Sequence, residues 1–251
     1  MKAVVLAGGK GTRLAPYTSV LPKPLMPIGS RAILELVVEH LARCGFTDIT
    51  FCVGYLGHLI QAVFDDGSTR GVRITYVHED EPHGTAGPIR LAGIPNEAVL
   101  VLNGDVLTGL DLRELVEHHK RCGNAMTIAS TERHTLMNYG VLHVGPESED
   151  SGRIVRFEEK PQLTSLVSMG FYVLEPAAVK VIPKGQRFDI PELIGSLIAS
   201  DQRVGAYLYA GMWLDIGRHE DYERAIRAWE EDPDFPLSHL GRRVAEAPFE
   251  A

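Results

Sequence analysis

The sequence has few cysteines, no long apolar run and a deficit of positive charge. Only three of its 251 residues are cysteine, an odd number without a C-x-x-C pair, so we expect free thiols in a reducing compartment. The net charge of −8 argues against non-specific binding to nucleic acid, which requires a basic surface. The ten histidines form no H-x-x-x-H or H-E-x-x-H pattern, so nothing in the sequence indicates a catalytic zinc site.

No run of apolar residues reaches the length of a membrane span. The apolar run Ala3–Ala7 is also too short for a signal peptide. We therefore expect a cytoplasmic protein without membrane association. The hydrophobic content of 45% and the charged content of 23% are ordinary for a globular protein, and the chain is long enough to bury an extensive core.

Short apolar runs alternate with helical patterns in the first half of the chain. We expect strands at 3–7, 49–53, 72–77, 99–102 and 126–130, and helices at 31–44 (capped by Ser30), 59–64 and 112–121. Such alternation predicts an α/β fold, Rossmann-like, with a mixed but mainly parallel sheet flanked by helices. Ligands bind beyond the carboxyl ends of such strands, where Gly8, Gly9 and Asp105 fall.

The second half has more strands and fewer helices. Strands are expected at 139–144, 154–157, 169–174 and 204–209, and helices at 191–199 and 218–229. We interpret this half as a smaller β region that covers one side of the cleft. The expected organisation is one domain over residues 1–229, divided into 1–131 and 132–229, with a loose tail over 230–251 that contains three prolines.

A glycine-rich loop, residues 8–14, follows the first strand. Glycines allow the backbone N–H groups to approach and cradle an anion, and the guanidinium of Arg13 suits phosphate. The loop lacks the G-K-[ST] ending of a P-loop, and Leu14 breaks the G-x-G-x-x-G spacing of a dinucleotide-binding turn. Lys23 follows between two prolines that restrict its backbone, which favours a placed cation.

Residues 7–14 together with Pro22-Lys23-Pro24 resemble the signature of the sugar-1-phosphate nucleotidyltransferases, also called nucleotide-sugar pyrophosphorylases. The resemblance continues to about residue 229. Residues 83–88 are similar to a segment of GDP-mannose pyrophosphorylases, with His83 in place of leucine. The resemblance implies the nucleotide-diphospho-sugar transferase fold, with 1–131 as the nucleotide-binding half and 132–229 as the sugar-binding half. It also implies that a nucleoside triphosphate and a sugar 1-phosphate give a nucleotide sugar and pyrophosphate.

The resemblance places the nucleotide against the first strand, the glycine loop and three later segments. The implied nucleotide-binding residues are Leu6, Ala7, Gly8, Gly9, Gly11, Thr12, Arg13, Lys23, Glu79, Gly84, Thr85, Asn103 and Gly104. Arg13, Lys23 and Asp105 are the expected catalytic residues. They would hold the leaving pyrophosphate, the α-phosphate and a metal ion, respectively.

Glu79 lies five positions before Gly84, where the family reads the nucleobase. A carboxylate only accepts hydrogen bonds, and guanine presents two adjacent donors, N1–H and N2–H₂. Uracil and thymine present one N–H group between two carbonyls, which would face an anion badly. The sequence therefore favours GTP over dTTP, UTP and CTP, while a solvated Glu79 in an acidic loop is the alternative.

Two aspartates, Asp105 and Asp215, match the metal-binding positions of the family. Each one alone is more often a turn residue or a helix cap, but together they predict a metal site. Carboxylate oxygens suit Mg²⁺, which binds phosphates at the same time. The resemblance therefore implies Mg²⁺ as the cofactor.

The sugar phosphate is expected to contact the second half of the chain. By resemblance, Lys160 pairs with its phosphate, Glu159 bonds to sugar hydroxyls, and Gly140 and Gly170 face the sugar. Ser168-Met169 departs from the family pattern, so mannose, a heptose, glucose and rarer sugars all remain open. Asp189 is expected to cap a helix rather than to bind sugar.

Two other functions compete with the transferase. A glycosyltransferase of similar architecture typically carries an Asp-x-Asp motif, whereas Val106-Leu107 follows Asp105. A non-catalytic protein that binds nucleotide sugars is disfavoured because every expected charged position is present. The oligomeric state is open, although relatives are often dimers or tetramers. The preferred reading requires that Arg13, Lys23, Asp105, Asp215 and Lys160 converge on one cleft.

Overall fold

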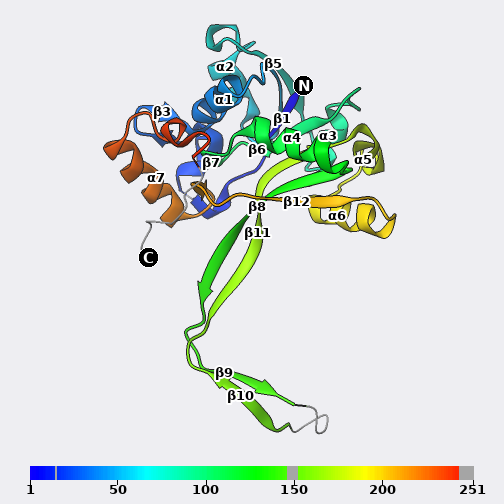
Figure 1. Cartoon of the computed structure of the whole chain (residues 1–251). Coiled ribbons are helices and arrows are strands. Elements are labelled where there is room, and N and C mark those ends of the chain that lie inside the picture. Colours follow the sequence, from blue (N-terminus) through cyan, green and yellow to red (C-terminus); the bar gives the residue numbers. More distant parts are fainter. Residues whose placement is uncertain (15, 146–151, 243–251) are drawn as a thin grey trace.

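The computed structural model describes residues 1–14, 16–145 and 152–242. A seven-stranded sheet runs through the body of the molecule in the order β12-β8-β11-β6-β1-β4-β5 (Figure 1). The strands β6, β1, β4 and β5 are parallel, β12 is parallel to β8, and β11 is antiparallel to both of its neighbours. The predicted α/β fold with a mainly parallel sheet is confirmed. Its strands are β1 (Ala3–Ala7), β4 (Asp48–Val53), β5 (Arg73–His78), β6 (Val99–Asn103), β8 (Met126–Leu136), β11 (Gln162–Leu174) and β12 (Val204–Leu208).

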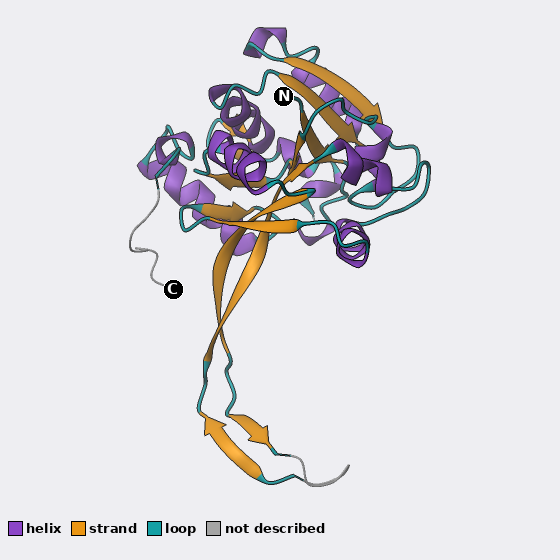
Figure 2. Ribbon diagram, turned by 45° about the vertical axis from the view of Figure 1, so that its right-hand side comes forward, coloured by secondary structure: helices purple, strands orange, loops and turns teal. Residues whose placement is uncertain are grey.

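Helices cover both faces of this sheet, so its strands are buried on both sides and read as continuous apolar runs. Figure 2 shows helices on both sides of the sheet. Alternate residues of β1 pack on opposite sides, because Val5 belongs to one core cluster and Val4 to the other. The helices are α1 (Ile33–Arg43), α2 (Gly57–Phe64), α3 (Gly87–Leu91), α4 (Leu112–Cys122), α5 (Pro176–Val181), α6 (Ile190–Ala199) and α7 (His219–Glu231).

The start of α1 differs from the prediction. Ser30 does not cap this helix, because it lies in the turn between two short paired strands, β2 (Pro27–Ile28) and β3 (Arg31–Ala32). Ala32 is the N-cap residue, and its N–H donates to Glu35 at 3.0 Å. The predicted cap of α6 is confirmed, since Asp189 is its N-cap residue and donates its backbone N–H to Glu192 at 2.7 Å.

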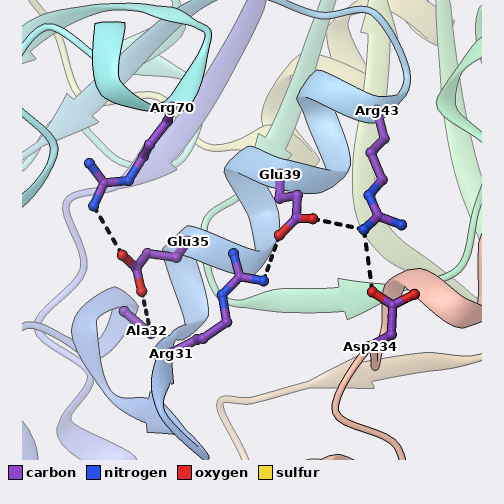
Figure 3. Close-up of polar contacts among 7 residues, drawn as sticks. All are labelled: Arg31, Ala32, Glu35, Glu39, Arg43, Arg70 and Asp234. Carbon is purple, nitrogen blue, oxygen red and sulfur yellow. Dashed lines mark hydrogen bonds and ion pairs between the residues drawn. The ribbon is translucent and has the colours of Figure 1, made fainter.

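The tail after residue 229 is not loose over residues 230–242. Phe235 and Leu237 are only 2% and 5% exposed. An ion pair of 3.3 Å joins Asp234 to Arg43 on α1, and Arg43 also pairs with Glu39 (Figure 3). Apolar side chains and this ion pair therefore hold the segment against the body, despite its prolines. Residues 243–251 lie outside the described part of the chain.

Strands β8 and β11 continue beyond the sheet as a two-stranded arm that projects from the body (Figures 1 and 2). A second hairpin forms the tip of this arm, from β9 (Val141–Val144) and β10 (Ile154–Glu158). The sequence predicts that this region covers the cleft, and the structure contradicts that prediction. The extended pairing continues to Gln162 and Leu136, so the chain runs outward before it turns.

The three cysteines are free thiols, as predicted. Burial raises the pKa of Cys52 to about 12, which makes this thiol unreactive near neutral pH. In the part of the chain that the structure describes, no helix has the length and apolar character needed to cross a membrane.

Candidate active site

A cleft of about 830 Å³ opens at the carboxyl ends of β1 and β6. The topology explains its location, because parallel strands deliver the loops that follow them to one edge of the sheet. Most of the sequence-predicted nucleotide and catalytic residues line this cleft: Leu6, Ala7, Gly8, Gly9, Gly11, Arg13, Lys23, Glu79, Gly84, Thr85, Asn103 and Asp105. The two others adjoin it, since Thr12 follows Gly11 and the Gly104 N–H donates to the Leu6 carbonyl at 2.9 Å.

Close packing explains why a glycine occupies the first position of the loop. A Cβ atom on Gly8 would lie 2.6 Å from Oε2 of Glu79 and 3.3 Å from the backbone N of Gly54. Any side chain would therefore push Glu79 away from the loop. The glycine loop and the residue expected to read the base are thus neighbours in space, although 71 positions separate them in the sequence.

A cluster of charges lies at one point of the cleft. A Cβ atom on Gly217 would lie 3.0 Å from Nζ of Lys23, 2.9 Å from Oδ1 of Asp215 and 3.6 Å from Nη2 of Arg13. Lys23 is only 7% exposed, and its ammonium group pairs with Oδ2 of Asp105. Four of the five charged residues expected to converge therefore do so. Gly217 is not among the predicted site residues, although it lies only two positions after Asp215.

Two short strands bring the aspartates together. β7 (Val106–Thr108) pairs with β13 (Trp213–Asp215), and the Ile216 N–H donates to the backbone carbonyl of Asp105 at 3.1 Å. Oδ1 of Asp215 accepts the Gly217 N–H at 2.9 Å. No group of three or more acidic, His or Cys side chains forms a metal-ligating cluster in residues 1–14, 16–145 and 152–242. A pair of carboxylates at an open cleft fits an ion such as Mg²⁺, which takes its other ligands from phosphate and water.

Glu79 is held in place before any base binds. Its backbone N–H donates to the Val53 carbonyl at 2.9 Å, and its Oε1 accepts the His83 N–H at 3.1 Å. Its side chain is 10% exposed, and burial raises the pKa of this carboxyl group. The observed burial argues against a solvated charge and leaves a partly desolvated acceptor at the wall of the cleft.

The wall near Gly84 depends on a residue that the sequence assigned to helix capping alone. Oδ1 of Asp189 accepts hydrogen bonds from both the N–H and the hydroxyl of Thr85, at 2.8 and 3.1 Å. Asp189 therefore caps α6 and fixes the Gly84-Thr85 segment at once. The contact joins positions 104 residues apart, so no local pattern in the sequence indicates it.

The sugar-side residues are divided between the cleft and the arm. Gly170 has a φ of +81°, and a Cβ atom there would lie 2.7 Å from Nδ2 of Asn103, at the cleft. Gly140, Glu159 and Lys160 are exposed in the arm, where the β9–β10 hairpin joins β8 and β11. A Cβ atom on Gly140 would lie 3.2 Å from Oε2 of Glu159, so these residues are grouped there. The prediction that Lys160 shares one cleft with the other charges is wrong for this chain taken alone.

Residues 2–232 match the model of a protein family described as nucleotidyl transferase. The chain belongs to this family. The match spans both the body, with its cleft, and the arm. The predicted membership is therefore confirmed.

Proteins similar to this chain differ in the base and sugar that their names give. Mannose-1-phosphate guanyltransferase beta-B of Xenopus laevis is 36% identical over 229 residues, which cover 88% of this chain and 62% of the relative. UTP–glucose-1-phosphate uridylyltransferase of Synechocystis is 34% identical over 247 residues, with 90% and 63% covered. The chain thus spans under two thirds of the length of these relatives. The solved structure of HddC from Yersinia pseudotuberculosis complexed with GMP-PN superposes with a TM-score of 0.71 and 26% identity, covering 91% of this chain and 99% of that one.

Proposed function

We propose that the protein transfers a guanylyl group from GTP to a sugar 1-phosphate and releases pyrophosphate. The convergence of Arg13, Lys23 and two aspartates beside a glycine loop carries this proposal. Such a site binds the phosphates of a nucleotide and neutralises charge at a transferred phosphoryl group. We assign residues 1–131 to nucleotide binding and residues 132–229 to the sugar phosphate.

The reaction is an in-line attack by a phosphate oxygen of the sugar 1-phosphate on the α-phosphorus of the triphosphate. A new P–O bond forms, the bond from the α-phosphorus to the bridging oxygen breaks, and pyrophosphate leaves with that electron pair. A phosphate monoester loses its second proton near pH ~6, so the nucleophile is already anionic at neutral pH. The mechanism therefore needs no general base, and alignment and charge stabilisation supply the rate.

Each charged residue of the cleft has a separate task. Arg13 and the N–H groups of residues 8–11 hold the β- and γ-phosphates that become pyrophosphate. Lys23 contacts the α-phosphate and offsets the charge that develops there. Asp105 and Asp215 would hold Mg²⁺, which supplies further neutralisation of the phosphate charges when it is bound.

Glu79 supports GTP as the nucleotide. One of its oxygens is engaged by the His83 N–H, and the other lies beside Gly8 at the phosphate loop. A carboxylate in this partly desolvated position favours a base edge with two donors and disfavours one with flanking carbonyls. The guanyltransferase relatives agree with this preference, whereas the uridylyltransferase relative supports UTP as the alternative.

Lys160 and Glu159 are proposed to bind the second substrate. The ammonium group would pair with the sugar phosphate and reduce its repulsion from the triphosphate, and the carboxylate would accept hydrogen bonds from sugar hydroxyls. Gly140 and Gly170 would leave room for the backbone to approach the sugar. Mannose 1-phosphate and heptose 1-phosphates are the favoured substrates.

The decisive experiment is a matrix of four triphosphates against a panel of sugar 1-phosphates, with pyrophosphate release as the readout. We expect the highest kcat/KM with GTP and a mannose-type or heptose-type phosphate, and no turnover after chelation of divalent ions. A preference for UTP or dTTP would contradict the assignment of Glu79. Complete absence of pyrophosphate would favour a binding protein, and glycosyl transfer from a ready-made nucleotide sugar would favour a glycosyltransferase.

A further inference from the structure

The arm leaves the candidate site of a single chain incomplete. The cleft is lined by nucleotide-side residues, and Glu159 and Lys160 are exposed on the arm beyond it. Figures 1 and 2 show the arm extending away from the body in both views. A two-stranded ribbon of this kind is marginally stable alone, so an ordered arm requires a further surface to pack on.

The base of the arm is fixed to the body in this outward direction. The guanidinium of Arg133 lies 4.8 Å above the ring of Trp213 and 3.3 Å from Oδ2 of the buried Asp221. The Trp213 indole N–H donates to the Met169 carbonyl on the opposite strand of the arm at 3.0 Å. Both strands are therefore clamped where they leave the sheet. Folding the arm back onto its own cleft would break these contacts and remove one of the two arginines that pair with the buried Asp221.

The tip presents apolar and substrate-binding groups together. Several apolar side chains of the arm are about half exposed or more: Leu136, Tyr139, Leu142, Ile154, Val155 and Phe157. Leu142 and Phe157 are strand partners, so part of this exposed apolar surface is contiguous, as it is on surfaces that bind another protein. Lys160 has a φ of +45°, a left-handed conformation that is sparsely populated except at glycine and is concentrated at functional sites.

Exposed apolar side chains also occur close to the cleft in sequence. Tyr17 and Val20, which lie in the segment between Arg13 and Lys23, are 60% and 76% exposed. The arm is also long enough to reach another molecule. Lys160 is five residues from Ser165, the strand partner of Arg133 in the clamp, so it lies up to ~16 Å of extended chain beyond that clamp.

We propose that two copies of this chain exchange arms, so that each arm places Glu159 and Lys160 at the nucleotide cleft of its partner. The assignment of these two residues to the sugar phosphate rests on the proposed function. A reciprocal exchange forms a closed two-fold dimer, which buries both apolar tips and completes both sites. A chain on its own binds nucleotide but lacks the second half of the site.

Complementation between two defective full-length chains tests this exchange. One chain carries E159A and K160A, and the other carries R13A. They are co-expressed with different tags and purified through both tags. The mixed dimer contains one cleft with an intact Arg13 and an intact arm from its partner, so we expect about half of the wild-type pyrophosphate release per dimer. Activity no higher than that of the two parents, or failure to recover a mixed dimer, would overturn the proposal.

A second readout does not depend on activity. Lys160 is replaced by the photoreactive residue p-benzoylphenylalanine, and the purified protein is irradiated. We expect a covalent dimer whose cross-linked peptides join position 160 to residues 8–23 of the other chain. The control replaces Arg73, on the edge strand β5, and should give no such link. Cross-links only within one chain would overturn the exchange, whereas a cross-linked dimer together with no pyrophosphate release by the wild-type protein would refute the proposed function and retain the exchange.

Discussion

The cleft and the arm carry two halves of one predicted site, yet they are built in opposite ways. In the cleft, parallel strands with covered faces deliver Arg13, Lys23 and Asp105 to a single edge of the sheet. In the arm, Glu159 and Lys160 lie in the link between β10 and β11, beside a hairpin in which β9 and β10 pair with each other. Packing between the sheet and its helices fixes where the side chains of the cleft lie. Strand pairing in the isolated ribbon fixes only its register, so the position of its side chains depends on further contacts.

The largest expected effect is the loss of turnover when a charged residue of the cleft is removed. R13A should lower kcat by about 10²- to 10³-fold, because it removes a donor from charge that develops in the transition state. The melting temperature should stay unchanged, since Arg13 is exposed. Steady-state kinetics and thermal melting check this expectation. The matched control is R73A, which removes an exposed arginine from the edge strand β5. A kcat near the wild-type value in R13A as well as in R73A would contradict the role of Arg13.

A substitution in the arm should change the KM for sugar 1-phosphate and leave the KM for nucleotide almost unchanged. K160A should raise the KM for sugar 1-phosphate by roughly 30-fold, because it removes a charge-assisted contact with that substrate. The KM for nucleotide should change little. Initial rates with each substrate varied in turn give both constants. Equal increases in the two values would remove the functional distinction between the arm and the cleft.

Acid should weaken the body through a buried histidine, His40, whereas His134 and His143 on the arm are exposed. Burial lowers the pKa of His40 to about 4, and its Nε2 donates to the Leu110 carbonyl at 2.8 Å. The unfolded chain binds this proton below pH ~6.5, so stability is full above that pH and falls as the pH decreases toward 4. At pH 5 the expected loss in the free energy of unfolding is about 2 kcal/mol.

Denaturant unfolding at pH 7 and pH 5 measures this loss. H40Q keeps a side-chain N–H donor for Leu110 but does not titrate, so it should remove most of the difference between the two pH values. An equal difference in the wild type and in H40Q would assign the acid sensitivity to other groups.

The smallest expected effect concerns the base. E79Q should reduce the preference for GTP over UTP, measured as a ratio of kcat/KM, by about tenfold, because the amide offers a donor to the uracil carbonyl and accepts less well from guanine. E81Q changes a neighbouring carboxylate that does not line the cleft and is the matched control. An unchanged ratio in E79Q would contradict base reading by this residue.

Local patterns predicted the cleft well and the arm poorly. The positions of the main strands along the chain, the glycine loop and the carboxyl-end positions of Gly8 and Asp105 follow from apolar periodicity and from the geometry of parallel sheets. The direction of the arm depends on Arg133 and Asp221, which are 88 positions apart, and no periodicity encodes such a contact.

The remaining errors have similar causes. Ser30 looks like a helix cap, but the short β2–β3 pairing places it in a turn and moves the start of α1 to Ile33. The prolines after residue 229 suggested a loose tail, whereas Phe235 and Leu237 bury enough apolar surface to hold that segment. In both cases a tertiary or strand contact overrode a local propensity.

Gly217 shows how much of this chemistry depends on an empty volume. The atoms of Lys23, Arg13 and Asp215 surround a space that a single methyl group would fill. In the proposed function, an oxygen of a substrate phosphate would need that same room. Alanine at this position would leave every charged group present and yet fill the space proposed for a phosphate oxygen. Gly217 therefore contributes through the absence of a side chain.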